Sequence, residues 1–231
     1  MRPRRPRGAP LAPGSREPSL TVVLKERYYD GRGIVPQLAA RYFREFGNAR
    51  TILDVGCGTG DFGRYRPSAD VEIFGVDLDS GAVARAARFE TVACLDLDTE
   101  PLPYEDETFD AVLAKDVLEH VQRPELLARE IHRVMRPRGV LIASVVMAKP
   151  RAVWGDYTHV RGFTQRSAQL LLEDAGFVVK ATWRMGGVPL SRRLNFIWLV
   201  PHLLRLPPFS QLWASSWELK AVKTNSATEE D

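Results

Sequence analysis

Three glycines directly behind a short aliphatic run are the first feature of this chain that suggests chemistry. The stretch ILDVGCGTGDFG at 52–63 places Gly56, Gly58 and Gly60 after a predicted buried strand. Glycine accepts positive φ and lets the backbone approach a ligand with no Cβ in the way. Because ligands of open parallel sheets bind beyond the carboxyl ends of the strands, we expect this turn to line a binding crevice.

Acidic residues around the turn indicate the charge of that ligand. Asp54 precedes the turn, and Asp61 stands where the GxGxxG spacing of a dinucleotide-binding turn requires glycine. Asp61 would direct a negative charge at the start of a following helix, where a pyrophosphate binds. The ligand should therefore carry positive charge and no phosphate. S-adenosylmethionine meets this requirement with its ammonium and sulfonium groups, and we expect Asp54 near the ammonium.

Two further strand ends carry acids that suit an adenosine. Asp77 closes a predicted strand 17 residues after Gly60, where a doubly wound site needs a carboxylate for the ribose hydroxyls. Asp77 does not separate S-adenosylmethionine from NAD, and a solvated strand-end acid is the alternative. Asp96 with the Leu97 backbone suits the adenine, with Asp98 as a rival.

The segment AKDVLEHV ends a later strand and brings three more polar residues toward the same crevice. For Lys115 and Asp116 a salt bridge at the rim competes with ligand contact. For His120 a structural hydrogen bond is favoured over catalysis.

A loop at 147–163 holds the first candidate for a general base. His159 lies at the ligand-binding end of the sheet, and an unperturbed histidine has a pKa of about 6.5. A hydrogen bond that stabilises the loop is the competing role. Asp156 and Arg161 are expected to orient His159 or to bind polar groups of a substrate.

The elements that must position these residues alternate between strands and helices. Aliphatic strands are predicted at 51–55, 71–77, 91–97, 109–116, 139–147, 177–184 and 212–223, and helices at 33–47, 80–89, 123–139 and 164–176. Continuous aliphatic strands between helices indicate a parallel sheet covered on both faces. The predicted fold class is α/β, doubly wound, with the last two strands as neighbours.

Composition favours one domain with tails. The chain has 231 residues and a net charge of +3, and its first twenty residues hold five arginines against one glutamate, which leaves the rest near neutral at −1. We expect a disordered basic leader at 1–20, one domain at 21–222 and a flexible tail at 223–231. Nucleic-acid binding by the folded part is not expected.

The number of cysteines and the hydropathy of the chain indicate its cellular location. Cys57 and Cys94 are the two cysteines, too few for a disulfide framework and without a zinc-site pattern, so a reducing cytoplasm and no metal are expected. The N-terminus lacks the apolar core of a signal peptide. The apolar run at 194–206 is shorter than the roughly 20 residues that a spanning helix needs.

Taken together, these motifs resemble the class I S-adenosylmethionine-dependent methyltransferases, most closely the type 11 subgroup with ubiquinone-biosynthesis-like enzymes. LDVGCGTGDFG is similar to the family's first motif and GVDLD to its second, while LPYEDETFDAVLAKDVLEHV and RVMRPRGVLIASV are similar to the segments around its fourth and fifth strands. The likeness covers about 33–183. It implies a Rossmann-like sheet of seven strands and methyl transfer to an acceptor.

The resemblance also implies roles for individual residues. The expected cofactor contacts are Asp54, Gly56, Gly58 and Gly60 for the methionine end, Asp77 for the ribose, and Asp96 and Leu97 for the adenine. Further cofactor-binding candidates are Cys57, Thr59, Leu78 and Lys115. The chain departs from the family in a short helix after the turn, ended by Pro67, and in Arg138, where glycine is usual. The alternatives are a nicotinamide-dependent oxidoreductase and a non-catalytic cofactor-binding interaction protein.

The segment 185–213 is an insertion between two predicted strands, and a connection that long is usually functional. It combines apolar side chains with arginines. One interpretation is that it completes the core. The other is that it covers a small-molecule or lipid-like acceptor, with peripheral membrane contact through 194–213. The acceptor and the oligomeric state stay open.

Overall fold

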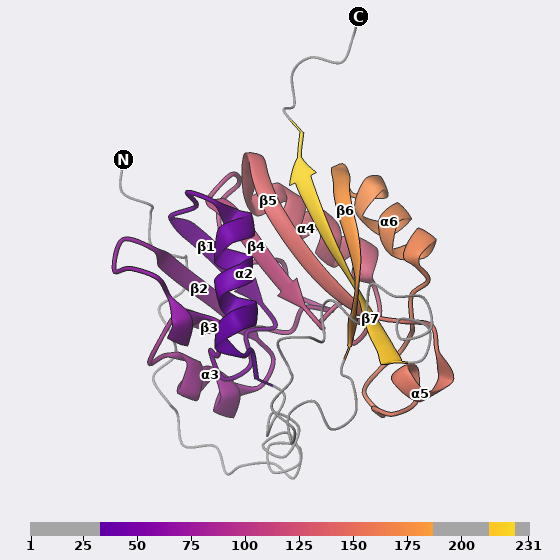
Figure 1. Cartoon of the computed structure of the whole chain (residues 1–231). Helices are drawn as coiled ribbons and strands as arrows, with labels where there is room; N and C mark the ends of the chain where they lie inside the picture. The colour runs from indigo at the N-terminus through magenta and orange to yellow at the C-terminus, as the bar shows by residue number, and fades with distance from the viewer. Residues whose placement is uncertain (1–32, 187–212, 225–231) are drawn as a thin grey trace, which may run out of the picture.

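The computed structural model describes residues 33–186 and 213–224, which form one seven-stranded sheet flanked by helices (Figure 1). The strands are β1 (Thr51–Val55), β2 (Glu72–Asp77), β3 (Thr91–Cys94), β4 (Phe109–Lys115), β5 (Met135–Val146), β6 (Phe177–Gly186) and β7 (Ala214–Lys223). The helices are α2 (Pro36–Phe46), α3 (Ser80–Ala86), α4 (Pro124–Val134), α5 (Pro150–Val153) and α6 (Gln165–Asp174), with a 3-10 turn, η1, at Gly63–Tyr65.

The strand order is β3-β2-β1-β4-β5-β7-β6. The first five strands run parallel, and β7 lies antiparallel between β5 and β6. The predicted doubly wound, mostly parallel sheet is therefore confirmed, as is the pairing of the last two strands. The chain begins at β1, moves outward to β3 and returns to β4, so the topology switches direction between β1 and β4. Ligands of open α/β sheets bind at such a switch point.

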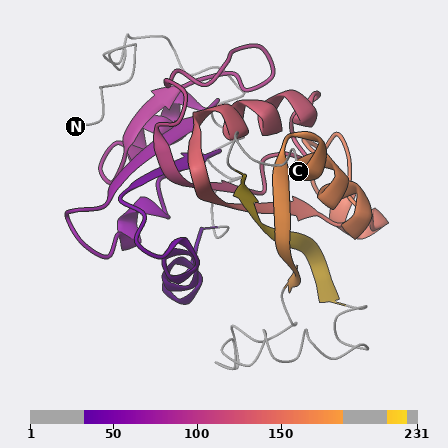
Figure 2. The same cartoon turned by 90° about the horizontal axis from the view of Figure 1, so that it is seen from above.

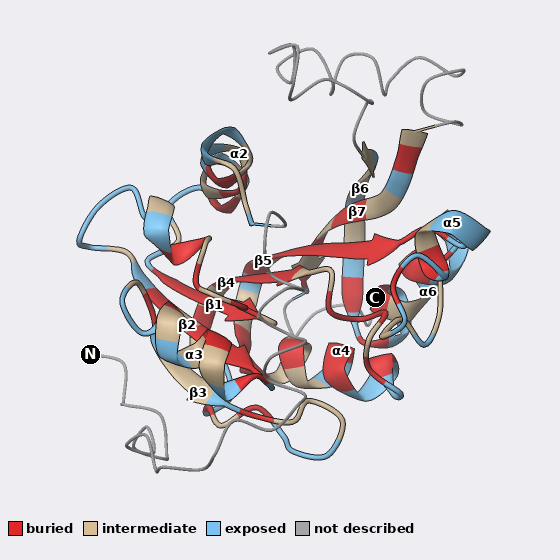
Figure 3. Ribbon diagram, turned by 90° about the horizontal axis from the view of Figure 1, so that it is seen from below, coloured by how far each residue is buried: buried red, intermediate tan, exposed pale blue. Residues whose placement is uncertain are grey.

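Helices cover both faces of the sheet, with α2 on one face and α4 and α6 on the other (Figures 2 and 3). On the α2 face, the Tyr42 and Phe62 rings pack edge to face, with centroids 6.4 Å apart. On the other face, Ile131 of α4 and Leu172 of α6 belong to the larger apolar cluster. Burial from both sides explains why most positions of β1 and the interior of β4 are apolar.

Two helix starts agree with the sequence signals. Thr164 caps α6, where its side chain accepts a hydrogen bond from the Ser167 N–H at 3.1 Å in a capping box. Pro124 occupies the first turn of α4, where its missing N–H has no helical partner to lose.

Several predicted elements are wrong in extent. The helix expected at 123–139 ends at Val134, and β5 begins at Met135 instead of at 139. The third strand ends at Cys94 instead of continuing to 97, because the Asp96 carboxylate and carbonyl accept backbone N–H groups from residues 98–100 and turn the chain. The second helix ends at Ala86, before 89. The helix expected after the glycine turn is only the 3-10 turn η1, so Asp61 does not face the N-terminus of an α-helix.

Several predictions lie outside the described residues. These are the leader at 1–20, most of the insertion at 185–213, and the tail beyond 224. Within the described ranges, no helix is long and apolar enough to cross a membrane.

Candidate functional site

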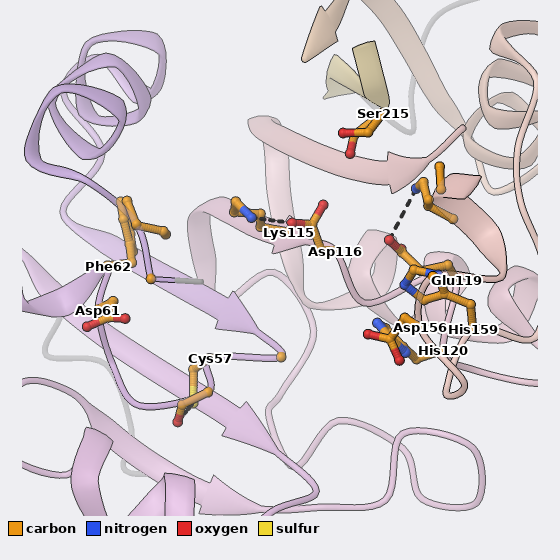
Figure 4. Close-up of a pocket in the computed structure, with 18 of the residues that line it drawn as sticks. Cys57, Asp61, Phe62, Lys115, Asp116, Glu119, His120, Asp156, His159 and Ser215 are labelled. Carbon is orange, nitrogen blue, oxygen red and sulfur yellow. Dashed lines mark hydrogen bonds and ion pairs between the residues drawn. The ribbon is translucent and has the colours of Figure 1, made fainter. Parts of the chain in front are cut away.

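A cavity of about 380 Å³ opens at the carboxyl ends of β1, β4 and β5, at the topological switch point (Figure 4). One wall is the glycine turn with Asp54, Asp61 and Phe62. The facing wall comes from the segments after β4 and β5 and from the start of β7. Its polar side chains are Lys115, Asp116, Glu119, His120, Arg151, Asp156, His159, Ser215 and Ser216.

The glycine turn has the backbone that its sequence predicts. Gly56, Gly58 and Gly60 have φ of 74°, 52° and 76°, in the left-handed region that side chains rarely adopt. A Cβ at Gly56 would lie 3.0 Å from Val117, and one at Gly60 would lie 2.8 Å from the Ala86 backbone. Gly56, Cys57, Gly58 and Thr59 line the cavity. Gly60 shapes the turn but does not line the cavity.

Asp54 lies in the floor of the site with 3% of its surface exposed. Burial raises the pKa of its carboxyl well above the usual range, and the neighbouring Glu90 and Asp77 carboxylates raise it further. The Lys115 ammonium opposes this shift. A cation bound beside Asp54 would offset the repulsion among these carboxylates. The predicted contact with an ammonium group would supply such a cation.

Asp77 fixes the shape of the turn. Its Oδ2 accepts the Gly58 N–H at 2.9 Å, and its Oδ1 accepts the Asp79 N–H at 2.9 Å. Leu78 beside it is 55% exposed. Neither residue is among those that line the cavity. The contact between Asp77 and the ribose stays a prediction. The structure adds a second role for Asp77, which is to shape the glycine turn.

The adenine candidates hold a turn after β3. Asp98 accepts the Gln122 N–H at 2.6 Å, while the Asp96 carboxylate accepts the Asp98 N–H at 3.0 Å. Leu97 is partly buried against the core. All three lie outside the cavity lining, so their contact with adenine also stays a prediction.

Lys115 and Asp116 form an ion pair at the centre of the cavity (Figure 4). Burial alone would raise the pKa of Asp116, but Lys115 and a hydrogen bond from the Ser144 hydroxyl lower it. Burial alone would lower the pKa of Lys115, but Asp116 raises it. Both groups are therefore charged at neutral pH. The salt bridge expected at the rim exists, and Lys115 also lines the cavity.

The imidazoles of His120 and His159 lie next to each other on the cavity wall that faces the glycine turn, with ring centroids 4.7 Å apart. The His159 Nδ1 lies 3.0 Å from the Val153 carbonyl, and the His120 Nδ1 lies 3.3 Å from the Thr158 carbonyl. A carbonyl only accepts, so each Nδ1 carries a proton, and Nε2 is the ring nitrogen left to accept one. The structural hydrogen bonds expected for both histidines are present, and they fix the tautomer that a base needs.

A short relay orients His120 further. The Asp156 Oδ1 accepts the Thr158 hydroxyl at 2.6 Å, and that hydroxyl lies 3.0 Å from the His120 Nδ1. Burial lowers the pKa of His120, and the nearby His159 lowers it further. Arg161 donates to the Gln122 carbonyl at 2.6 Å, so its side chain braces the neighbouring segment.

Glu119 is a site residue that the sequence reasoning missed. It is 1% exposed, its Oε1 accepts the Val146 N–H at 3.1 Å, and its Oε2 has no hydrogen-bond partner among the described residues. Burial raises its pKa to about 8, and Asp116 contributes to the shift. Its position beside His120 was the available signal. The ligand atoms of Glu119, His120 and His159 lie within 4.8 Å of one another, a group that could hold a metal ion.

Comparison with known proteins places this chain in a family. A family model described as a methyltransferase domain matches residues 53–143. The chain is 36% identical over 186 residues to an uncharacterized methyltransferase from Mycolicibacterium paratuberculosis, an alignment that covers 75% of this chain and 70% of the relative. The chain belongs to the class I S-adenosylmethionine-dependent methyltransferases. The comparisons give no support to the alternatives of an oxidoreductase or a non-catalytic binding protein.

Two further comparisons support the methyltransferase family. A ubiquinone biosynthesis O-methyltransferase from Ruegeria pomeroyi is 30% identical over 129 residues, which is 52% of this chain and 52% of the relative. A structure of an S-adenosylmethionine-dependent methyltransferase from Archaeoglobus fulgidus has a TM-score of 0.65 at 19% identity, and the alignment covers 88% of this chain and 100% of that one. At that identity the likeness shows the shared fold.

The cofactor of this methyltransferase is S-adenosylmethionine, and the glycine wall fits it. Gly56 and Gly58 line the cavity, and because glycine has no side chain, a ligand can approach their backbone closely. The adjoining Asp54 gains from a nearby positive charge.

Proposed function

We propose that this methyltransferase transfers the methyl group to a hydroxyl or amine of a small polar acceptor held between the glycine wall and the two histidines. The observation that carries this proposal is the pair of imidazoles with Nε2 as the acceptor atom, facing Asp54 and the turn within one cavity. A protonated acceptor needs a base at that place, whereas a carbanion or a thiolate would not.

Bound S-adenosylmethionine supplies an electrophilic methyl on a sulfonium. In such a transfer the acceptor atom would displace the sulfur in line, and the electron pair of the carbon–sulfur bond would stay on sulfur. The task of the protein is to hold the two reactants in this geometry. Asp54, Gly56 and Gly58 would hold the methionine end, and the acceptor would lie against His120 and His159.

His120 is the stronger of the two candidates for the general base. Its imidazole is oriented through Thr158 by Asp156, an arrangement in which a third group fixes the base. Its lowered pKa keeps it neutral, and thus able to accept a proton, at neutral pH. His159, the first candidate from the sequence, would shape the acceptor site from its Val153 contact and could accept the proton in its place.

The walls indicate a polar acceptor. Charged and hydroxyl side chains, including the Lys115–Asp116 pair, Arg151 and Ser215, surround the space beyond the turn. These groups bind hydroxyl, amine or carboxylate substituents by hydrogen bonds. The lipid-like alternative depends on 187–212, which lie outside the described residues, so it remains an outcome of the acceptor screen.

We also place the enzyme in the cytoplasm. The two cysteines are not joined in a disulfide, Cys57 being buried and Cys94 exposed, which suits a reducing compartment.

The test is a screen with S-adenosylmethionine labelled in its methyl group, read by mass shift, over phenols, catechols, primary amines, carboxylic acids and phospholipid vesicles. We expect label in a polar hydroxyl or amine compound, and a fall in kcat of roughly 100- to 10,000-fold in His120→Gln. His159→Gln is the matched variant. A full rate in both variants, or label confined to phospholipids, would contradict the proposal. Parallel reactions with EDTA test whether Glu119, His120 and His159 work without a metal ion.

A further inference from the structure

Glu90 is a buried carboxylate directly behind the glycine turn, outside the set that lines the cavity. It is 7% exposed, its Oε1 accepts the Gly63 N–H at 2.9 Å, and its Oε2 has no hydrogen-bond partner within the described parts of the chain. Two glycines make room for it, because a Cβ at Gly63 or Gly75 would come within 2.4 Å of its side chain.

The sheet register brings this carboxylate next to Asp54. Gly75 of β2 pairs directly with Asp54 of β1, and residues paired in this way point to the same face of a sheet, about 5 Å apart. The Glu90 Oε2 lies 2.4 Å from the point where a Gly75 Cβ would be. The Glu90 carboxyl therefore takes the place of the missing Gly75 side chain, beside that of Asp54.

The surroundings hold an excess of negative charge. The titratable and charged groups facing Glu90 or Asp54 are Cys57 of the turn, Asp61 and Arg64 after it, Asp77 of β2, Tyr104 after β3 and Lys115 of β4. Burial raises the pKa values of the Cys57 thiol and the Tyr104 hydroxyl, so both stay neutral. Lys115 already pairs with Asp116, and Arg64 lies 3.9 Å from Asp61.

Neighbouring buried carboxyl groups with so little counter-charge cannot all be ionised. Burial raises the pKa of Glu90 to about 7, although the Gly63 N–H lowers it, and Asp61 adds to the rise. Without a ligand, at least one of the Glu90 and Asp54 carboxyl groups therefore holds a proton near neutral pH.

We propose that Glu90 is a positioning residue that holds a proton behind the glycine turn and releases it to solvent when the cationic methionine end of S-adenosylmethionine binds beside Asp54. The proposal rests on the cofactor site described above. The ligand's positive charge favours the ionised pair, and ionised Glu90 binds the Gly63 N–H more strongly, which tightens the turn around the cofactor. Affinity for S-adenosylmethionine should therefore rise with pH.

Titration calorimetry of S-adenosylmethionine in three buffers of different ionisation enthalpy counts the protons released. The titrations use about pH 6.5, below the pKa of an α-amino group, so that the cofactor itself stays protonated. We expect the full-length protein to release close to one proton per bound cofactor. Glu90→Gln, which keeps the acceptor for Gly63, should release less than half as much while still binding. Glu72→Gln, an exposed carboxylate at the start of the same strand as Gly75, should match the wild type.

The outcomes separate this proposal from the cofactor assignment. Tight binding with no proton release by the wild type, or equal release by Glu90→Gln, would overturn the role of Glu90 and leave the cofactor site intact. No binding of S-adenosylmethionine at all would overturn the site as well. If Glu90→Gln does not fold, the pH dependence of the wild-type dissociation constant decides. For one linked proton, this constant should fall by up to tenfold for each unit that the pH rises in the range below about pH 7. A constant value there would refute the proposal.

Discussion

Asp77 has two tasks in this site, since its carboxylate holds the Gly58 and Asp79 N–H groups and is also predicted to hold the ribose. The first task could not be predicted from the sequence, because a strand-end acid gives no sign of which backbone N–H groups will turn toward it. Glu119 was missed for a similar reason. Its place next to His120 in the sequence does not show that the fold will bury it against the Val146 N–H.

Asp77→Ala should weaken binding of both S-adenosylmethionine and its demethylated product. Hydrogen bonds to a charged group are worth about 1.5–3 kcal/mol each, so the loss of one strong ribose contact should raise Kd roughly 10- to 150-fold. Titration calorimetry with both ligands measures this. Near-wild-type affinity in a folded variant would remove Asp77 from the cofactor site.

Glu119 should make stability depend on pH. Its pKa rises from 4.5 to about 8 on folding, so the folded state binds more protons than the unfolded state in that window. The free energy of unfolding should fall as pH rises through it, by up to about 1.4 kcal/mol per pH unit from this group. Denaturant titrations of wild type and Glu119→Gln should diverge accordingly, with Glu125→Gln as the exposed control. Parallel pH profiles for wild type and Glu119→Gln would show that Glu119 is ionised throughout.

At the scale of elements, sequence patterns predicted existence and type better than boundaries. The strands β1, β2 and β4 and the start of α6 follow from aliphatic runs and a capping residue. The end of β3 does not follow from such a pattern. Asp96 turns the chain through hydrogen bonds, whereas the aliphatic residues around it suggest that the strand continues. The short turn η1 was anticipated as a short helix ended by Pro67, but its 3-10 geometry was not.

Arg138 marks a strained connection between α4 and the main run of β5. Its φ of 65° is left-handed, a conformation that costs a residue with a Cβ about 1–2 kcal/mol and explains why glycine is usual there in the family that the sequence resembles. Arg138→Gly should stabilise the protein by about 1 kcal/mol and raise Tm by roughly 2–4 °C. Arg138→Ala keeps the Cβ and should give no gain in a thermal melt. Equal Tm values for the two variants would contradict the strain.

For the whole molecule, the order of strands is what assembles the site. Asp54, Lys115 and His159 are far apart in the sequence, and the switch between β1 and β4 brings them to one cavity. The resemblance to a known family predicted this arrangement, whereas the polarity of the acceptor wall emerged only from the structure. The sequence of the insertion at 185–213 left open whether it completes the core or covers a small-molecule or lipid-like acceptor.

Deleting residues 1–18 should leave the fold and the cofactor affinity unchanged. The segment has five arginines and little apolar surface to bury. Thermal melts and titration calorimetry compare the full chain with the shortened one. A Tm lowered by several degrees would show that the leader packs on the domain.

Titration of S-adenosylmethionine into wild type and Asp54→Asn tests the assignment of the crevice most directly. Asparagine keeps the size of the buried side chain and removes its charge, and it relieves repulsion with Glu90 and Asp77, so the fold should persist. We predict micromolar or tighter binding by the wild type and at least roughly tenfold weaker binding by the variant, with an unchanged melting curve. Equal affinity for the two proteins would contradict a cofactor site at the glycine turn.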